Sequence, residues 1–319
     1  MARLLLAVPD FPRNVETESV PRLPALESLI AHGCPGARAV EWRAWLLRQA
    51  GMEVPGPLPV ARIVAGREGH FAIATPVHLL AGLEHVHFDP SGLPSLTPEE
   101  WTRLCTGFNN VFGGDGLQLA REHAVGLLSL PRPIDALTRD PEPLAGREAG
   151  AWLPSGTEGA WLRRLMTEVQ MWLHEHDLNA EREARGLCPV NGLWLWGLGD
   201  DALRALRPPQ AMLASRDPIL RRLWEDGGQV GADPDSLEAA LETGAERVVA
   251  SVSLAALAPT PGESLQRLEA DWFAPLADAM TSGRVGGADL LLGDAALVLR
   301  PTDRFRIWRR VRPWQEALA

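Results

Sequence analysis

Three short, mainly apolar runs constrain the fold of this chain most strongly: Arg3–Val8, Val190–Trp196 and Val248–Val252. Each is short for a buried helix, whereas a strand covered on both faces has such a nearly continuous apolar sequence. Patterns with helical spacing alternate with these runs along the chain, which is typical of the α/β class. The sequence therefore predicts an α/β fold with a mixed sheet flanked by helices and with antiparallel additions.

Several other elements follow from local signals. Apolar residues at helical spacing predict the strongest helix over Thr157–His176, and a Thr97 cap predicts another that ends near Phe112. Short apolar runs joined by turn residues predict strands at Asp289–Leu292, Ala295–Leu299 and Arg304–Val311. We interpret the arginines near the end of the chain (309, 310 and 312) as the solvated face of an edge strand.

The composition is that of an ordinary globular protein, with 46% apolar and 23% charged residues. We expect one compact α/β domain over residues 1–319. Residues 131–150 form the loosest stretch, rich in proline, aspartate and arginine, and a boundary between two lobes would fall there.

The charge balance excludes some partners. The chain carries 31 basic and 41 acidic residues, a net charge of −10, which argues against nucleic acid and against an anionic membrane as partners. No run of 18 apolar residues occurs, and the apolar start is too short for a signal peptide. Three cysteines without a CxxC pair suit a reducing compartment. We therefore expect a soluble, cytoplasmic protein.

The absence of two residue types limits the chemistry. The chain has no lysine and no tyrosine, which excludes Schiff-base catalysis, a P-loop lysine and a tyrosine general acid. A chain whose cations are all arginine is also what a GC-rich genome produces. We find no dinucleotide fingerprint, no serine nucleophile elbow and no metalloprotease helix.

The densest group of polar residues lies between the strongest helix and the second apolar run. An amide, imidazoles, a guanidinium and a glycine loop after a strand could together bind a small anion such as phosphate. The alternative is a helix C-terminus, where histidines and a turn asparagine are common. The predicted ligand-binding residues are Gln170, His174, His176, Asn179, Arg182, Asn191, Gly197 and Gly199.

A second group offers weak metal ligands. His85 and His87 alternate on a predicted strand and His78 precedes it, so three imidazoles could bind a transition metal. Asp10 follows the first strand, where α/β enzymes often place a metal-binding carboxylate. The alternatives are histidines on a half-exposed strand and an aspartate in a turn. We predict no metal and no cofactor, with these four residues as the weak candidates.

The segment from His176 to Gly199 resembles two related families. It reads His-Asp-Leu-Asn-Ala-Glu-Arg, then Pro189-Val-Asn191 and Trp194-Leu-Trp-Gly. It resembles the proteobacterial RpfE-type regulatory proteins, and Pro76-Val-His78 and the closing Trp308-Arg-Arg extend that likeness over most of the chain. It also resembles, over about 25 residues, the archaeal-type cofactor-independent phosphoglycerate mutases of the alkaline-phosphatase superfamily.

The resemblance implies a fold and a set of catalytic residues, and the sequence shows which of these residues are absent. It implies a mixed sheet like that of alkaline phosphatase, two divalent metals held by aspartates and histidines, and a serine nucleophile. No histidine follows His176, and Val249–Leu257 contains neither aspartate nor histidine. The stretch Ala39–Ala44, near the expected nucleophile, contains no serine. Phosphoryl transfer without metals loses its main electrostatic stabilisation, so these departures argue against mutase activity and Asp10 would be a remnant.

Three functional hypotheses remain open. The favoured one is a degenerate, non-catalytic phosphoglycerate-mutase-like protein that acts in regulation, through a small phosphorylated ligand or a regulatory protein partner. The alternative is a metal-dependent phosphomutase or phosphatase with a rebuilt site. The third is an interaction protein whose polar group is only a helix cap.

Overall fold

A computed structural model describes residues 1–12, 20–54, 57–82, 84–199, 209–225, 229–231, 236–258, 260–306 and 308–318. The chain divides into two compact units: unit 1 comprises Met1–Glu53 and Arg207–Ala319, and unit 2 comprises Val54–Leu206. Residues 131–150, where the sequence would place a boundary, lie within unit 2. The expected α/β class with a mixed sheet is confirmed.

Unit 1 is built on a seven-stranded sheet with the order β10-β9-β11-β1-β12-β13-β2. The first five strands are parallel to one another, whereas β13 pairs with β12 and β2 pairs with β13 in the antiparallel sense. The strands are β1 (Ala2–Val8), β2 (Cys34–Pro35), β9 (Met212–Ser215), β10 (Gln229–Val230), β11 (Arg247–Ser251), β12 (Val285–Leu292) and β13 (Ala295–Leu299).

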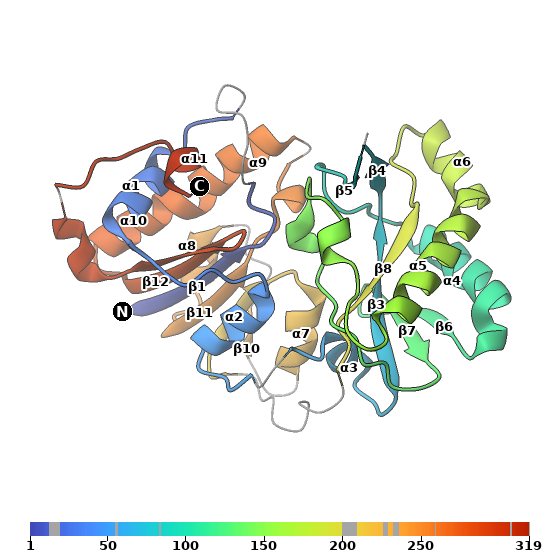
Figure 1. The fold of residues 1–319 in the computed structure, drawn as a ribbon. Coiled ribbons are helices and arrows are strands. Elements are labelled where there is room, and N and C mark those ends of the chain that lie inside the picture. Colours follow the sequence, from blue (N-terminus) through green and yellow to red (C-terminus); the bar gives the residue numbers. More distant parts are fainter. Residues whose placement is uncertain are drawn as a thin grey trace. The chain divides into compact units, whose positions relative to one another are not determined.

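The helices of unit 1 pack against this sheet (Figure 1). The α-helices are α1 (Pro24–His32), α2 (Trp42–Gln49), α7 (Pro218–Glu225), α8 (Leu237–Leu241), α9 (Pro261–Leu268), α10 (Ala274–Thr281) and α11 (Trp314–Ala317). A π-helical turn, η6 (Glu269–Phe273), lies between α9 and α10. Short 3-10 turns η5 (Leu254–Ala256) and η7 (Pro301–Phe305) complete the unit.

Strand β1 shows why the apolar run folds as a strand. Leu4 to Val8 are fully buried, and alternate side chains of a strand point to opposite faces. Leu4, Leu6 and Val8 belong to one core cluster with residues of α1, α9 and α10, so the other alternate residues face the opposite side of the sheet. Both faces are therefore covered, as the apolar run predicts.

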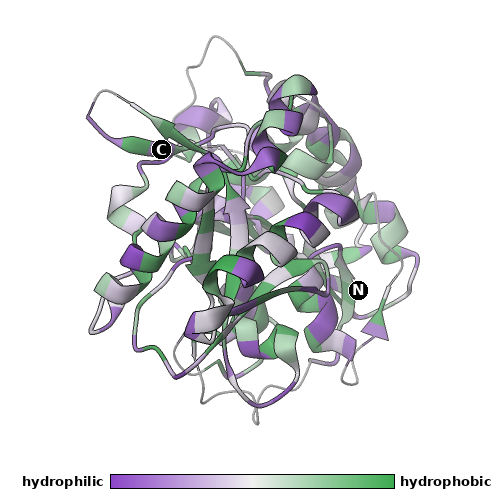
Figure 2. Ribbon diagram, turned by 90° about the vertical axis from the view of Figure 1, so that its right-hand side faces the viewer, coloured by the Kyte–Doolittle hydropathy of each residue, from purple (hydrophilic) through white to green (hydrophobic). Residues whose placement is uncertain are grey.

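Unit 2 contains a four-stranded antiparallel sheet, ordered β6-β7-β3-β8, and a small hairpin. Its helices pack a continuous apolar cluster against one face of the sheet. Figure 2 shows apolar residues in green along the strands and alternating with polar residues, in purple, along the helices. The elements are α3 (Val60–Ala65), β3 (His70–Val77), β4 (Leu79–Ala81), β5 (Val86–Phe88), α4 (Pro98–Phe112), β6 (Gln118–Glu122), β7 (Val125–Leu130), α5 (Gly159–His174), α6 (Asp177–Ala184) and β8 (Gly192–Trp196).

One predicted strand is wrong. The described part of residues 304–311 forms no strand: η7 runs to Phe305, and turns follow. The Arg300 backbone N–H donates to the Asp303 carboxylate over 2.8 Å, which starts a 3-10 turn after Pro301 instead of a strand. Within the described residues, no helix is both long enough and apolar enough to cross a bilayer.

Candidate functional site

The parallel strands of unit 1 end at one edge of the sheet, where ligands bind in open α/β sheets. Asp10 lies there, two residues after β1. Its carboxylate accepts hydrogen bonds from the Ser253 hydroxyl at 2.7 Å and from the backbone N–H groups of Leu254 and Ala255 at 2.9 and 3.1 Å. Both oxygens of Asp10 therefore cap η5, and this carboxylate ties β1 to the segment after β11.

Neighbouring strands end in hydroxyl groups. Ser215, the last residue of β9, and Ser251, the last residue of β11, are hydrogen-bonded through their side chains at 2.5 Å. The Asp217 backbone N–H donates to the Ser215 hydroxyl at 2.9 Å. The two hydroxyl groups are therefore engaged with each other, and the Ser215 hydroxyl also accepts a backbone hydrogen bond.

A second carboxylate at this edge is also engaged. Asp217 accepts from the Arg43 guanidinium at 2.6 and 3.1 Å and from the backbone N–H of Leu220 at 2.8 Å. Both charged side chains are 8% exposed, and the Arg43 guanidinium lies 4.1 Å from the ring centroid of Trp42. Asp217 therefore caps α7 and neutralises a buried arginine.

These residues do not fit a centre of two divalent metals. Such a centre needs several carboxylate or imidazole ligands with available lone pairs, whereas Asp10 and Asp217 direct theirs at hydrogen-bond donors. Among the residues that the structure describes, no group of three histidine, cysteine, aspartate or glutamate side chains could bind a metal. We derive no metal-dependent step from this edge.

The weak metal candidates are divided between the two units. Asp10 belongs to unit 1, whereas His78, His85 and His87 belong to unit 2. His85 lies 3.1 Å from a carboxylate oxygen of Glu148, and His87 lies opposite Leu80 in the β4–β5 hairpin. The Nδ1 atom of His78 is buried and has no hydrogen-bond partner in the described structure.

Among the predicted ligand-binding residues, Asn179 is a backbone clamp. Its amide nitrogen donates to the carbonyls of Leu173 and Val190 at 2.8 and 2.9 Å, and its amide oxygen accepts from the Val190 N–H at 2.8 Å. The side chain is buried, so it joins the end of α5 to the segment before β8. These bonds use the polar atoms that a ligand would need.

Arg182 has a similar role. Its guanidinium donates to the carbonyls of Cys188 and Ser95 at 2.8 and 3.1 Å and to the Glu100 carboxylate at 3.0 Å. Arg182 and Glu100 are 3% and 7% exposed. Glu100 also accepts from the Thr97 N–H in the capping box that starts α4. The pair therefore holds α4 and α6 together.

Asn191 joins β8 to the hairpin. Its amide accepts from the Leu79 N–H at 2.8 Å and donates to the Leu79 carbonyl at 2.7 Å. At the opposite end of β8, Gly197 adopts φ +72° and Gly199 adopts φ +141°. A Cβ on Gly197 would lie 3.0 Å from the Val60 Cβ, so this glycine allows close packing against α3.

His176 lines a groove of about 530 Å³ between α4 and the end of α5. Its Nδ1 accepts from the Leu178 N–H at 3.1 Å, and its ring meets Trp172 edge-to-face at 4.8 Å. Burial, and secondly the Arg103 charge, lower the pKa of His176, which favours the neutral ring that can accept this bond. Arg103 lines the same groove.

The two remaining side chains lie elsewhere. Gln170 lines a different groove of about 400 Å³, with His85, Glu148 and Arg163. His174 is exposed at the last position of α5. The eight predicted residues are therefore near one another in sequence but do not line one pocket.

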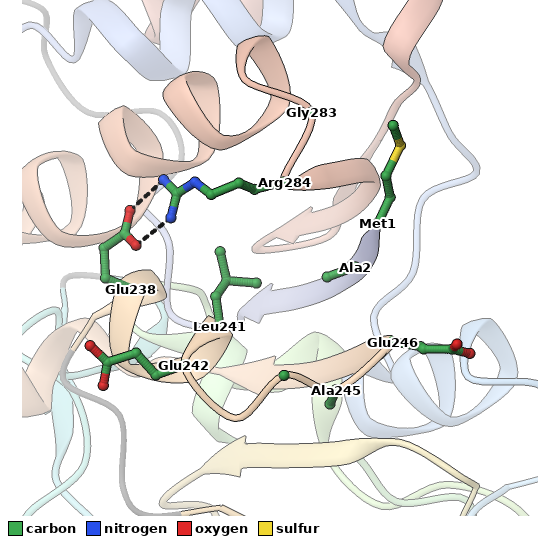
Figure 3. A pocket seen from close by; sticks show the side chains of 10 residues that line it. Met1, Ala2, Glu238, Leu241, Glu242, Ala245, Glu246, Gly283 and Arg284 are labelled. Carbon is green, nitrogen blue, oxygen red and sulfur yellow. Dashed lines mark hydrogen bonds and ion pairs between the residues drawn. The ribbon is translucent and has the colours of Figure 1, made fainter.

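Sequence reasoning missed the polar groups at the edge of unit 1. Arg43 and Asp217 are 174 positions apart, and no local pattern joins them. Ser215 could have been noticed as a polar residue that ends a short apolar run. A further cavity, of about 440 Å³, lies where the parallel strands begin, with the Glu238–Arg284 ion pair beside it (Figure 3). It contains none of the predicted site residues.

Comparison with known proteins gives partial matches. No family profile matches the chain. The chain is 38% identical over 77 residues to a 2,3-bisphosphoglycerate-independent phosphoglycerate mutase 2 from Methanothermobacter thermautotrophicus. The matched residues are 24% of this chain and 18% of that protein. Over 104 residues it is 35% identical to the corresponding mutase from Methanothrix thermoacetophila, 33% of this chain and 26% of that protein. The matches thus span about a quarter or less of the relatives' length.

Two solved structures align with most of the chain at low sequence identity. The cofactor-independent phosphoglycerate mutase from Thermoplasma acidophilum aligns with a TM-score of 0.37 and 14% identity, over 94% of this chain and 89% of that chain. The PH0037 protein from Pyrococcus horikoshii aligns with a TM-score of 0.42 and 15% identity, over 94% and 87%. The expected relationship to cofactor-independent phosphoglycerate mutases is confirmed by the sequence matches, over part of the chain, and the RpfE-type likeness stays a prediction.

Proposed function

We propose that this chain is a degenerate, non-catalytic relative of cofactor-independent phosphoglycerate mutases with a regulatory role. The proposal rests on the hydrogen bonding of Asp10. Its two carboxylate oxygens accept three hydrogen bonds from Ser253, Leu254 and Ala255. A carboxylate so engaged is a structural cap, and its neighbours at the strand ends are hydroxyl groups. The motif likeness to RpfE-type regulatory proteins supports the regulatory part.

Binding of a small phosphorylated ligand is the narrower form of this proposal. Asn179, Arg182 and Asn191 are committed to backbone atoms, so the His176 groove is the better place. It offers the Arg103 guanidinium, and Arg103 is paired with Glu181 at 2.5 Å. An incoming anion would exchange with that exposed carboxylate.

A turnover assay tests the proposal. The purified chain is mixed with 3-phosphoglycerate and with a chromogenic phosphomonoester, each with added Mn²⁺ or Zn²⁺, beside the Methanothermobacter mutase as positive control. We expect no turnover above a buffer blank. Turnover at enzyme-like rates that is lost in an Asp10→Ala variant would contradict it and would favour the alternative, a metal-dependent phosphomutase or phosphatase with a rebuilt site.

Calorimetry tests the narrower form. We expect 3-phosphoglycerate or inorganic phosphate to bind the wild type and to bind at least about tenfold more weakly to Arg103→Ala. Arg164→Ala, an exposed arginine of α5 paired with Glu168, is the matched control. Equal binding by both variants would remove the His176 groove from the proposal and leave the non-catalytic part intact.

A further inference from the structure

The segment that runs from the end of η7 toward α11 is the most basic stretch of the chain. Residues 304–312 read Arg-Phe-Arg-Ile-Trp-Arg-Arg-Val-Arg, with five arginines and no carboxylate, in a chain whose net charge is −10. In Figure 1 the segment is the red loop at the edge of unit 1. Its local charge is therefore opposite to that of the whole protein.

Two of its arginines fix the segment to the fold. Arg306 donates to the His32 carbonyl at 3.1 Å and to the Cys34 sulfur at 2.9 Å, and Arg309 donates to the Gly33 carbonyl at 2.7 Å. The His32 and Gly33 carbonyls lie at the C-terminal end of α1, where backbone carbonyls lack partners within the helix.

The far end of the segment is anchored in the core. Trp314 is 1% exposed, packs edge-to-face on Phe11 at 5.1 Å and donates its indole N–H to the Pro21 carbonyl at 3.1 Å. Its backbone N–H also donates to Glu27 at 3.3 Å. Arg306, Arg309 and Trp314 are thus fixed to the fold, which lowers the ordering entropy that opposes binding beside them.

Next to these anchors in the sequence, three apolar side chains face solvent. Phe305, Trp308 and Val311 are 63%, 74% and 51% exposed, and Arg310 and Arg312 are exposed beside them. We call these five residues the arginine–aromatic surface. Tryptophan and arginine are the residues that contribute most binding energy at protein interfaces, and exposed apolar groups rimmed by charge mark such interfaces.

We propose that the arginine–aromatic surface docks an acidic segment of another protein, one that carries apolar side chains among its carboxylates. Carboxylates match the guanidinium groups of Arg310 and Arg312, and apolar side chains cover Trp308 and Phe305. A short acidic segment contacts only the positive region. A membrane or a nucleic acid is an extended polyanion that would also meet the acidic remainder of the chain.

Selection from a displayed library of random dodecapeptides on the full-length chain tests this inference. We expect enrichment of acidic peptides with aromatic or branched residues. Their affinity should fall at least about tenfold in Trp308→Ala and in the double variant Arg310→Glu, Arg312→Glu. Matched controls on α5 are Met171→Ala, at a side chain 61% exposed, and Arg164→Glu, at one 79% exposed. Both controls should bind like the wild type, and thermal melting shows that every variant is folded.

Three results would overturn the inference. They are the absence of enriched acidic peptides, enriched peptides that the surface variants bind equally well, and stronger binding to another polyanion. The last is measured with vesicles that contain about 30% phosphatidylserine and with a single-stranded oligonucleotide. The turnover assay does not involve this surface, so the two proposals fail separately.

Discussion

Individual polar residues of this chain stabilise the backbone at the places where the sequence predicts ligand contacts. Asn179, Arg182 and Asn191 each form hydrogen bonds with backbone groups of another segment of unit 2. Buried backbone N–H and carbonyl groups need partners as strictly as a bound phosphate does, and the same side chains serve both needs. A single sequence therefore identifies such residues as important but does not distinguish a clamp from a binding residue.

Replacement of Arg182 by methionine tests the clamp. The change leaves the Glu100 carboxylate and the Cys188 carbonyl without their buried donor, so we expect a loss of about 3 kcal/mol in the free energy of unfolding of the protein. Arg185 lies 3.5 Å from the same carboxylate but is 56% exposed, and Arg185→Met should cost less than about 1 kcal/mol. Urea unfolding measures both, and equal losses would contradict the clamp.

Gly197 can be tested in the same way. In Gly197→Ala a Cβ is placed in a left-handed residue, 3.0 Å from the Val60 Cβ and 3.3 Å from the Ala61 nitrogen. We expect a loss of at least about 2 kcal/mol. Gly186 has a similar φ, +70°, and a Cβ there would meet no described atom within 4 Å, so Gly186→Ala should cost only about 1 kcal/mol. Similar losses would show that packing against α3 is unimportant.

Glu27 makes the stability of unit 1 depend on pH. The hydrogen bonds from Arg22, at 2.5 and 2.7 Å, lower the pKa of Glu27 below its ordinary value of 4.5, against an opposing effect of burial. The ionised group therefore stabilises the fold above pH 4.5, and this contribution is lost as the pH falls through the lowered pKa. Glu27→Gln should melt several degrees below the wild type at pH 7 and approach it in acid. A constant difference across this range would contradict the assignment.

At the scale of elements, apolar runs, helical spacing and a helix cap predicted several of the helices and strands. The runs at β1, β8 and β11 are strands, and α4 and α5 lie where the Thr97 cap and the helical spacing of apolar residues predict them. The failure at Arg304–Val311 has a tertiary cause beside the local 3-10 turn, because Arg306 and Arg309 bond the end of α1, which is more than 270 residues away. A pattern of alternating residues contains no information about such distant acceptors.

The cap on η5 gives a prediction at this scale. Asp10→Ala removes the acceptor of three hydrogen bonds, and we expect a loss of about 2 kcal/mol in the free energy of unfolding. A metal-binding Asp10 would behave differently, because its removal would leave the stability of metal-free protein unchanged or raised. Denaturant unfolding after dialysis against a chelator measures this difference.

At the scale of the whole molecule, the order of the elements along the sequence does not reveal the two units. Strand β1 lies between β11 and β12, so unit 1 is closed by segments from both ends of the sequence while unit 2 is continuous. Composition marks loose stretches such as residues 131–150, but a unit whose strands come from both ends of the chain is defined by pairing over more than 200 residues. The fold class was therefore predictable and the division into units was not.

Elemental analysis of tag-free protein, purified from cells grown with added manganese and zinc, tests the central claim most directly. The engaged carboxylates of Asp10 and Asp217 predict metal far below one equivalent per chain, with the same result for Asp10→Ala. One to two equivalents of manganese or zinc, lost in the Asp10→Ala variant, would contradict the proposal and show that the metal-dependent chemistry of the mutases is retained.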